Sequence, residues 1–225
     1  MKILSINKEL KYGSLNIDSI SLSSLGEVVV KEYDYIVISG GDGAIRRTIK
    51  ELQDIKDLPT FILNPIGSFN VVAKVNRVPK LEQILKNLED TNSLKLKKQE
   101  FFKLNSEIFL FSAGNMGDLQ HIFISETLRF GFLKQGILKY ILTLLFLLPI
   151  HIAVTPFMLL SSRRFFIFTP LSFIKKFGSF YGKVDNIEID LANEYNFLEL
   201  DGDIVTIYES SLKINKAGTI NIGVI

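Results

Sequence analysis

The chain has 225 residues, which is long enough for one large domain or two small ones with separate cores. Its formal net charge of +2 argues against a broad nucleic-acid-binding surface, because such a surface needs a strong excess of Lys and Arg. The absence of cysteine excludes disulfides and thiol catalysis and fits a cytoplasmic protein. With only two histidines, His121 and His151, a histidine-rich metal site is not expected. The first residues do not have the pattern of a secretory signal peptide.

The amino-terminal part alternates short apolar runs with amphipathic segments, a pattern typical of a parallel sheet covered by helices on both faces. One helix is predicted where Ile45, Ile49, Leu52 and Ile55 recur at helical spacing. We therefore expect an abbreviated α/β domain at residues 1–93. Its predicted strands include residues 2–6, 35–39 and 61–63, and its further helices lie at residues 71–75 and 81–88.

From residue 94 onward the sequence changes to strand-like runs, for example residues 108–111 and 165–168. Short alternating runs of this kind favour antiparallel strands. We expect a mainly antiparallel, β-sandwich-like second domain with inserted helices at residues 94–225. One of these helices is predicted at residues 137–148, where apolar side chains occupy more than one face.

A glycine-rich turn, Gly40-Gly41-Asp42-Gly43, lies between a predicted strand and a predicted helix. Glycines expose backbone amides there, and the helix dipole favours the negative charge of a phosphate. The carboxylate of Asp42 could hold Mg²⁺ or accept a proton from an attacking hydroxyl, and either role assists phosphoryl transfer. The alternative is a simple tight turn at the start of a helix, with Asp42 near its N-cap.

A second turn, Pro65-Ile66-Gly67-Ser68-Phe69-Asn70, also follows a strand and precedes a helix. In open α/β sheets, ligands bind beyond the carboxyl ends of the strands, so the two turns are expected on the same rim. Ser68 could donate a hydrogen bond to a phosphate, and Asn70 could cap the next helix or contact a nucleotide.

The two turns together resemble the Gly-Gly-Asp-Gly-Thr and Pro-x-Gly-Thr-x-Asn-x-x-Ala motifs of diacylglycerol kinase catalytic domains, with Ala73 in the last place. Sphingosine kinases are similar, and NAD kinases share the first motif. Further segments resemble the family's later motifs in the family's order. These are Asn115-Met116-Gly117-Asp118, the pair Gly136 and Tyr140, and Leu200-Asp201-Gly202-Asp203 in place of Asp-Gly-Glu.

This resemblance implies a lipid kinase with an α/β nucleotide-binding domain, a β-sandwich-like lipid domain, and ATP and Mg²⁺ as cofactors. The nucleotide-binding residues it implies are Gly40, Gly41, Asp42, Gly43, Gly67, Ser68 and Asn70. The catalytic residues would be Asp42, Asp201 and Asp203, and the last two would also be metal ligands. Taken alone, Asp201-Gly202-Asp203 favours a plain hairpin turn. The family's threonines are replaced here by Ala44 and Ser68, and its final Glu by Asp203.

An apolar run without Lys, Arg, Asp or Glu spans residues 140–162 and is followed by Arg163-Arg164 and later by Lys175-Lys176. It is long enough to cross a bilayer, but Pro149 and Pro156 divide it into shorter pieces. A buried helix and strand around a lipid pocket, a transmembrane helix, and docking at the membrane interface are all open interpretations. We expect peripheral membrane contact with a lipid substrate.

The favoured function is an ATP-dependent kinase that phosphorylates a hydroxyl of diacylglycerol or a related membrane lipid. Two alternatives remain open. The first is a catalytically impaired lipid-binding protein of the same fold, which the substitution at Ala44 and the short amino-terminal part favour. The second is an NAD kinase, against which the second glycine turn and the apolar run count.

Overall fold

The computed structural model describes residues 1–67, 69–115, 141, 145, 156–157 and 159–225. The chain forms two compact units, one of residues 1–101 with 217–225 and the other of residues 102–216. The division falls within two long strands, β5 (Lys95–Leu104) and β14 (Ser211–Val224). The limits expected from the sequence, 1–93 and 94–225, remain a prediction.

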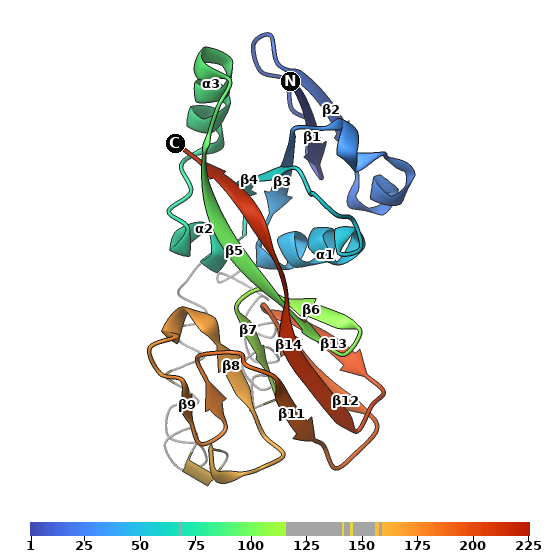
Figure 1. The fold of residues 1–225 in the computed structure, drawn as a ribbon, viewed down its shortest axis with the longest axis vertical. Helices are drawn as coiled ribbons and strands as arrows, with labels where there is room; N and C mark the ends of the chain where they lie inside the picture. Colours follow the sequence, from blue (N-terminus) through green and yellow to red (C-terminus); the bar gives the residue numbers. More distant parts are fainter. Residues whose placement is uncertain (68, 116–140, 142–144, 146–155, 158) are drawn as a thin grey trace. The chain divides into compact units, whose positions relative to one another are not determined.

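The first unit is built on a parallel sheet in the order β2-β1-β3-β4 (Figure 1). Every pairing between these neighbours is parallel, and β14 continues the sheet in parallel beside β4, with Ile222 opposite Phe61. The strands are β1 (Lys2–Ile6), β2 (Asn16–Ile20), β3 (Tyr35–Gly40) and β4 (Thr60–Pro65).

Helices follow β3 and β4 as the apolar spacing predicts. Helix α1 (Asp42–Leu52) buries Ile45, Ile49 and Leu52, but it ends before Ile55, which the spacing had included. Helices α2 (Val71–Val75) and α3 (Leu81–Thr91) follow β4. Side chains of α3 form one buried cluster with the sheet, and each such side chain contributes about 1.5–3 kcal/mol through burial. The buried members are Ile3, Val37, Ile62, Ile84 and Leu88.

The connection between β1 and β2 is unusually short for parallel strands. Such strands normally need a crossover of a dozen residues or more, usually with a helix. Here residues 7–15 make the connection without helical structure. Between β2 and β3 the chain forms only two short 3₁₀ helices, η1 (Leu22–Glu27) and η2 (Val30–Glu32). The first half of this α/β unit therefore forms its parallel strands but has no α-helix between β1 and β3.

The second unit has two layers of strands. Sheet B runs in the order β13-β12-β7-β8-β10-β9, and all its pairings are antiparallel except the one between β8 and β10. Its strands are β7 (Ser112–Gly114), β8 (Phe166–Phe168), β9 (Lys176–Phe177), β10 (Phe180–Tyr181), β12 (Asn196–Leu200) and β13 (Asp203–Ile207). A 3₁₀ turn, η3 (Thr169–Leu171), follows β8.

The other layer contains β6 (Glu107–Phe109), β11 (Ile187–Asp190) and the parts of β5 and β14 that belong to this unit. Strand β6 pairs with β5 and β11 with β14, both antiparallel. Side chains from both layers share one apolar cluster, including Phe109, Phe165, Leu198 and Leu212. The predicted fold class, a parallel α/β part and a mainly antiparallel sandwich-like part, is confirmed.

The expected inserted helix at residues 137–148 lies almost wholly outside the described residues, as does most of the apolar run at 140–162. Of the helices in the described part of the chain, none is long and apolar enough to span a bilayer.

Candidate functional site

The first glycine turn lies where β3 ends and α1 begins. Gly41 is the N-cap residue of α1 in an extended conformation, and no side chain caps the helix there. An α-helix leaves the amides of its first turn without intrahelical partners, so this end of α1 presents N–H donors and a positive dipole. A Cβ on Gly40 would come within 2.5 Å of the Ala44 side chain, so the strand meets the helix tightly at this point. Gly43 is half-buried in the first turn of the helix.

The second glycine turn follows β4, the neighbour of β3 in the sheet. Asn70 has a left-handed backbone (φ 48°) and closes the turn with its side chain. Its Oδ1 accepts a hydrogen bond from the Gly67 amide (3.1 Å), and its Nδ2 donates one to the Gly67 carbonyl (2.6 Å). Asn70 occupies the N-cap position of α2, but its side chain does not cap that helix. The capping role expected for this side chain is therefore wrong. Ser68 lies outside the described residues.

The two turns touch through their backbones. A Cβ on Gly67 would lie 2.9 Å from the Gly41 Cα atom and 2.8 Å from Asn70 Oδ1, closer than real side chains come. The Ile66 amide also donates a hydrogen bond of 3.1 Å to the Gly40 carbonyl. Glycine at position 67 is thus required by close approach, and the two turns form one continuous rim at the carboxyl ends of β3 and β4.

Asp42 joins the two turns. Its Oδ2 accepts a hydrogen bond of 2.7 Å from the Val71 amide, and its Oδ1 accepts one of 3.0 Å from the Val72 amide. The residue that begins α1 therefore caps α2. Burial raises the pKa of Asp42 above its usual value, and the two amides and the charge of Lys74 oppose that rise. An ionised carboxylate has about four acceptor positions, so two remain beside the two amides.

The hairpin between β12 and β13 contains the other predicted acids. Asp201 (φ 52°) and Gly202 (φ 89°) are its two central residues, with Leu200 opposite Asp203. Positive φ at both positions is the geometry of a two-residue hairpin turn, so the turn expected from Asp201-Gly202-Asp203 alone is present. Asp203 opens β13 and is partly exposed.

Asp201 is buried and anchors this hairpin to the preceding segment. Its carboxylate accepts hydrogen bonds from the amides of Leu110 (2.7 Å), Phe111 (2.9 Å) and Ser112 (3.0 Å). Its own amide donates to the Ser112 carbonyl at 3.0 Å. Burial raises the pKa of Asp201 to about 7, although the three amides lower it and nearby Glu199 raises it further. This geometry gives Asp201 a structural role, while its predicted metal and catalytic roles stay predictions.

Glu199 is a partner of the hairpin that the sequence motifs did not single out. It accepts a hydrogen bond from the Ser112 hydroxyl (3.0 Å) and another from the Gly202 amide. The only sequence signal for Glu199 is the alternation of apolar and polar residues along β12. That alternation does not show that an acid will hydrogen-bond to the hairpin turn. Within the described ranges, no three His, Asp or Glu side chains come together as a ready-made metal site.

A comparison with protein families matches residues 18–102 to the diacylglycerol kinase catalytic domain. The predicted resemblance is confirmed. The matched segment contains both glycine turns, Asp42 and the helices that follow them. The match lies almost wholly within the first unit.

Among curated proteins, the diacylglycerol kinase of Bacillus subtilis (strain 168) is 28% identical over 88 residues, which are 39% of this chain. The aligned part spans only 29% of the length of that relative. Among solved structures, a diacylglycerol kinase from Bacillus anthracis str. Sterne has the same fold. It aligns with a TM-score of 0.57 and 14% identity, covering 100% of this chain and 97% of the other.

Proposed function

We propose that the protein is an ATP-dependent lipid kinase that transfers a phosphoryl group to a hydroxyl of diacylglycerol or a related membrane lipid. The observation that carries this proposal is the joined pair of glycine turns, with Asp42 bonded across them, inside the segment that matches the diacylglycerol kinase catalytic domain. Glycine at positions 41 and 67 keeps side chains away from the point where the two turns meet, and a polyphosphate can approach such a backbone closely.

In the proposed reaction, the lipid hydroxyl oxygen forms a bond with the terminal phosphorus of ATP while the bond from that phosphorus to the bridging oxygen breaks. ADP leaves, and the hydroxyl proton passes to a carboxylate. We assign this acceptor role to Asp42, because its pKa is raised by burial and its oxygens keep acceptor positions beyond the Val71 and Val72 amides. The amides at the start of α1 would hold the phosphate charge.

Mg²⁺ fits this site only as an ion held mainly by substrate phosphates. Such ions need one or two protein carboxylates and keep several waters, so a single carboxylate with free acceptor positions suffices. Asp42 would hold such an ion only in place of its proton-acceptor role, because a carboxylate bound to Mg²⁺ is a poor base. The bound ion would offset phosphate charge. Of the two acids predicted as metal ligands, Asp203 is tested by Asp203→Asn. Asp201 is left unchanged, because its loss would also disturb the hairpin.

The test is transfer of radiolabelled phosphate from ATP to a panel of lipids that includes diacylglycerol, with NAD as a soluble acceptor in parallel. We expect a labelled lipid product, abolished in Asp42→Asn and kept in Asp54→Asn, which changes an exposed acid just after α1. Transfer that survives Asp42→Asn would refute the assignment of Asp42, and labelled NADP without labelled lipid would replace the lipid kinase by an NAD kinase.

The second candidate function is a catalytically impaired lipid-binding protein. The short β1–β2 connection favours it, because residues 7–15 contain no helix whose amino terminus could face a nucleotide. Alanine at position 44 supports the same alternative, since it has no hydroxyl to donate to a phosphate. A direct titration with ATP and Mg²⁺ separates the two functions: absence of binding, together with retained lipid binding, favours the impaired protein.

A further inference from the structure

Four large apolar side chains of the second unit project into solvent. The exposed fractions are 77% for Phe157, 83% for Leu160, 78% for Phe173 and 66% for Phe177. Single exposed apolar residues are common on protein surfaces, but neighbouring ones of this size mark an interaction site.

The hairpin of β9 and β10 binds the segment that carries Leu160. The Ser179 amide donates to the Leu159 carbonyl at 2.8 Å, and the Ser179 hydroxyl lies within hydrogen-bond distance of the Leu159 and Ser161 carbonyls (3.0 and 2.5 Å). The hairpin turns at Gly178 (φ 56°), where any Cβ would strike the Leu159 carbonyl oxygen at 2.3 Å. The segments that carry Leu160 and Phe177 are therefore held together at the turn of this hairpin.

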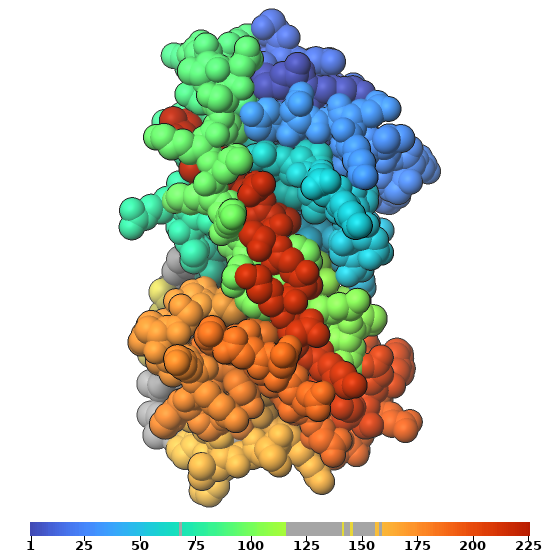
Figure 2. All heavy atoms as spheres, in the orientation of Figure 1, coloured from blue at the N-terminus to red at the C-terminus, as the bar shows by residue number. Residues whose placement is uncertain are grey.

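The same hairpin also binds the turn that carries Phe173. The Gly182 amide, just after β10, donates to the Ile174 carbonyl at 3.1 Å, and the Ile174 amide donates to the Leu171 carbonyl at 2.9 Å. A Cβ on Gly182 would collide with both of these carbonyl oxygens. Two segments, residues 159–161 and 171–174, are thus fastened to the hairpin that carries Phe177. The gold and orange atoms of the second unit form one continuous region in Figure 2.

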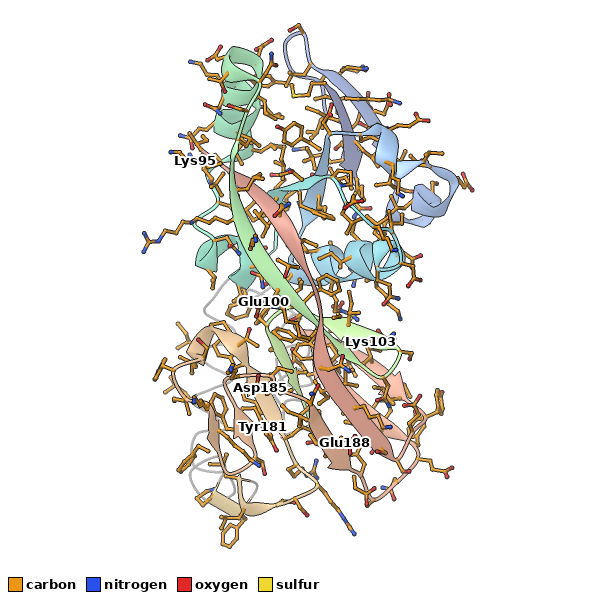
Figure 3. All side chains as sticks on the ribbon, viewed as in Figure 1. Lys95, Glu100, Lys103, Tyr181, Asp185 and Glu188 are labelled. Carbon is orange, nitrogen blue, oxygen red and sulfur yellow. The ribbon has the colours of Figure 1, made fainter. Side chains whose placement is uncertain are left out.

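Basic residues accompany these apolar side chains. Arg163, Arg164, Lys175 and Lys176 are all exposed, and Lys176 Nζ lies 5.0 Å from the centre of the Tyr181 ring. From residue 127 to 184 the sequence has eight Lys and Arg and no Asp or Glu. The rest of the chain has 18 Lys and Arg against 24 Asp and Glu, so positive charge is concentrated in this stretch. The next acid, Asp185, lies beyond β10 (Figure 3). It pairs with Lys183 at 3.1 Å.

We propose that this surface, formed by Leu160, Phe173 and Phe177 with the four exposed cations, docks onto an anionic lipid bilayer. We call it the hairpin surface. Apolar tips enter the boundary between headgroups and acyl chains, and the Lys and Arg side chains are attracted to anionic headgroups. The charge complementarity selects a bilayer with anionic lipid over a neutral one.

A second exposed aromatic group in the same unit shows what is specific about the hairpin surface. Tyr195, Phe197 and Tyr208 are also exposed. The centre of the Tyr195 ring lies 5.0 Å from that of Phe197 and 5.5 Å from that of Tyr208. Their sequence neighbours are the acids Glu194 and Glu209, which an anionic bilayer would repel. This acidic aromatic group therefore supplies a matched control: its side chains are also exposed aromatics, but the charges beside them are negative.

The inference deepens the proposed function, and it rests on that function only for the idea that the substrate lies in the bilayer. Binding to vesicles needs no ATP, so it is measured separately from phosphoryl transfer. If vesicles bind and no lipid is phosphorylated, the kinase proposal fails and the docking surface stands. If lipid dispersed in detergent is phosphorylated and vesicles do not bind, the docking surface fails alone.

The experiment is co-sedimentation of the full chain, without ATP, with phosphatidylcholine vesicles that contain or lack phosphatidylglycerol. We expect binding to the anionic vesicles and little to the neutral ones. Lys175→Gln with Lys176→Gln should weaken anionic binding about 30-fold, from about 1 kcal/mol per lysine. Phe173→Ser with Phe177→Ser should weaken it by more than about 10-fold, because each phenylalanine loses its transfer into the apolar phase.

The matched controls are Lys95→Gln with Lys103→Gln on β5 for charge (Figure 3), and Phe197→Ser with Tyr208→Ser for aromatic area. Neither should change vesicle binding, and thermal unfolding should confirm that all four variants fold. Equal binding to both vesicle types, equal weakening by a control pair, or no binding by the wild type would overturn the proposal. So would a stable dimer that the double phenylalanine variant dissociates without any change in vesicle binding.

Discussion

Asp42 and Val72 are 30 residues apart in sequence, yet the Asp42 carboxylate accepts a hydrogen bond of 3.0 Å from the Val72 amide. A second bond of 2.7 Å joins it to the Val71 amide. The first residue of α1 thus determines where α2 begins, and through α2 it positions the second glycine turn. A residue that motif comparison marks as catalytic is also a structural cap, so its replacement should change two properties.

Replacing Asp42 by Asn should lower both stability and activity. The amide side chain presents one N–H group where the carboxylate had an acceptor, so one of the two α2 amides loses its partner at a cost of about 1–3 kcal/mol. Phosphoryl transfer should fall below detection. Urea unfolding and the lipid kinase assay measure the two effects, and Asp54→Asn, at an exposed site, should change neither. Full stability of Asp42→Asn would contradict the capping role.

Replacing Gly67 by Ala should force the two glycine turns apart. The added Cβ would lie 2.9 Å from Gly41 Cα, a backbone atom that cannot yield as a flexible side chain would. We expect a loss of about 1–3 kcal/mol in unfolding free energy, as for other overpacked sites, and weaker ATP binding. Gly26→Ala is the matched control, because a Cβ there meets nothing within 4 Å. Equal stabilities of the two variants would show that the turns do not need their close contact.

Replacing Asn70 by Ala removes both the left-handed backbone preference and the two hydrogen bonds that close the second turn. Asn92→Ala, at the end of α3, removes a left-handed Asn (φ 53°) without those two bonds. Both variants should lose stability, on the order of 1 kcal/mol from the backbone alone. Only Asn70→Ala should also weaken ATP binding, measured by titration calorimetry. A similar loss of ATP affinity in Asn92→Ala would point to a general effect of destabilisation.

The buried acid Asp201 should make stability fall as the pH rises. Its pKa is about 7 in the folded protein against 3.8 in the reference, so between these values the folded state holds a proton that the unfolded state has released. Raising the pH through this window therefore favours unfolding, by up to about 1.4 kcal/mol per pH unit from this group.

Asp201→Asn has no such titration, so the stability difference between wild type and variant should shrink, or turn in favour of the variant, from pH 4 to pH 7. Denaturation followed by circular dichroism at several pH values measures that difference. A difference that grows with pH would mean that the amides of Leu110, Phe111 and Ser112 stabilise the ionised form more than burial opposes it.

The local pattern of apolar and polar residues was sufficient to predict most of the helices and strands of the first unit. The spacing of Ile45, Ile49 and Leu52 predicted α1, and short apolar runs predicted β1, β3 and β4, because helices and strands each impose their own period on buried side chains. The end of α1 was predicted too late, because Ile55 continues the helical period beyond Leu52, where the helix stops. The period of apolar residues indicates which face of a helix is buried. It does not indicate the residue at which the helical backbone hydrogen bonds end.

The roles of the site residues depended on contacts that the sequence does not record. Asn70 precedes a helix, which is all that an N-cap pattern requires, yet its side chain turns back to Gly67 while Asp42 caps α2 from another element. Likewise Asp201 matches a hairpin turn, but its three amide donors come from residues about 90 positions earlier. Such partners meet only after the sheets have formed.

By itself, the sequence determined the two glycine turns, the order of the motifs and the change from a parallel to an antiparallel half. Those features depend on local backbone freedom and on the periods of secondary structure. Only the tertiary structure decided that Gly41 and Gly67 touch, that Asp42 caps a helix not its own, and that two segments with exposed apolar side chains are fastened to the β9–β10 hairpin. The physical reason is that hydrogen bonds and close contacts between distant segments depend on distances in space, which residue order and hydrophobic period do not specify.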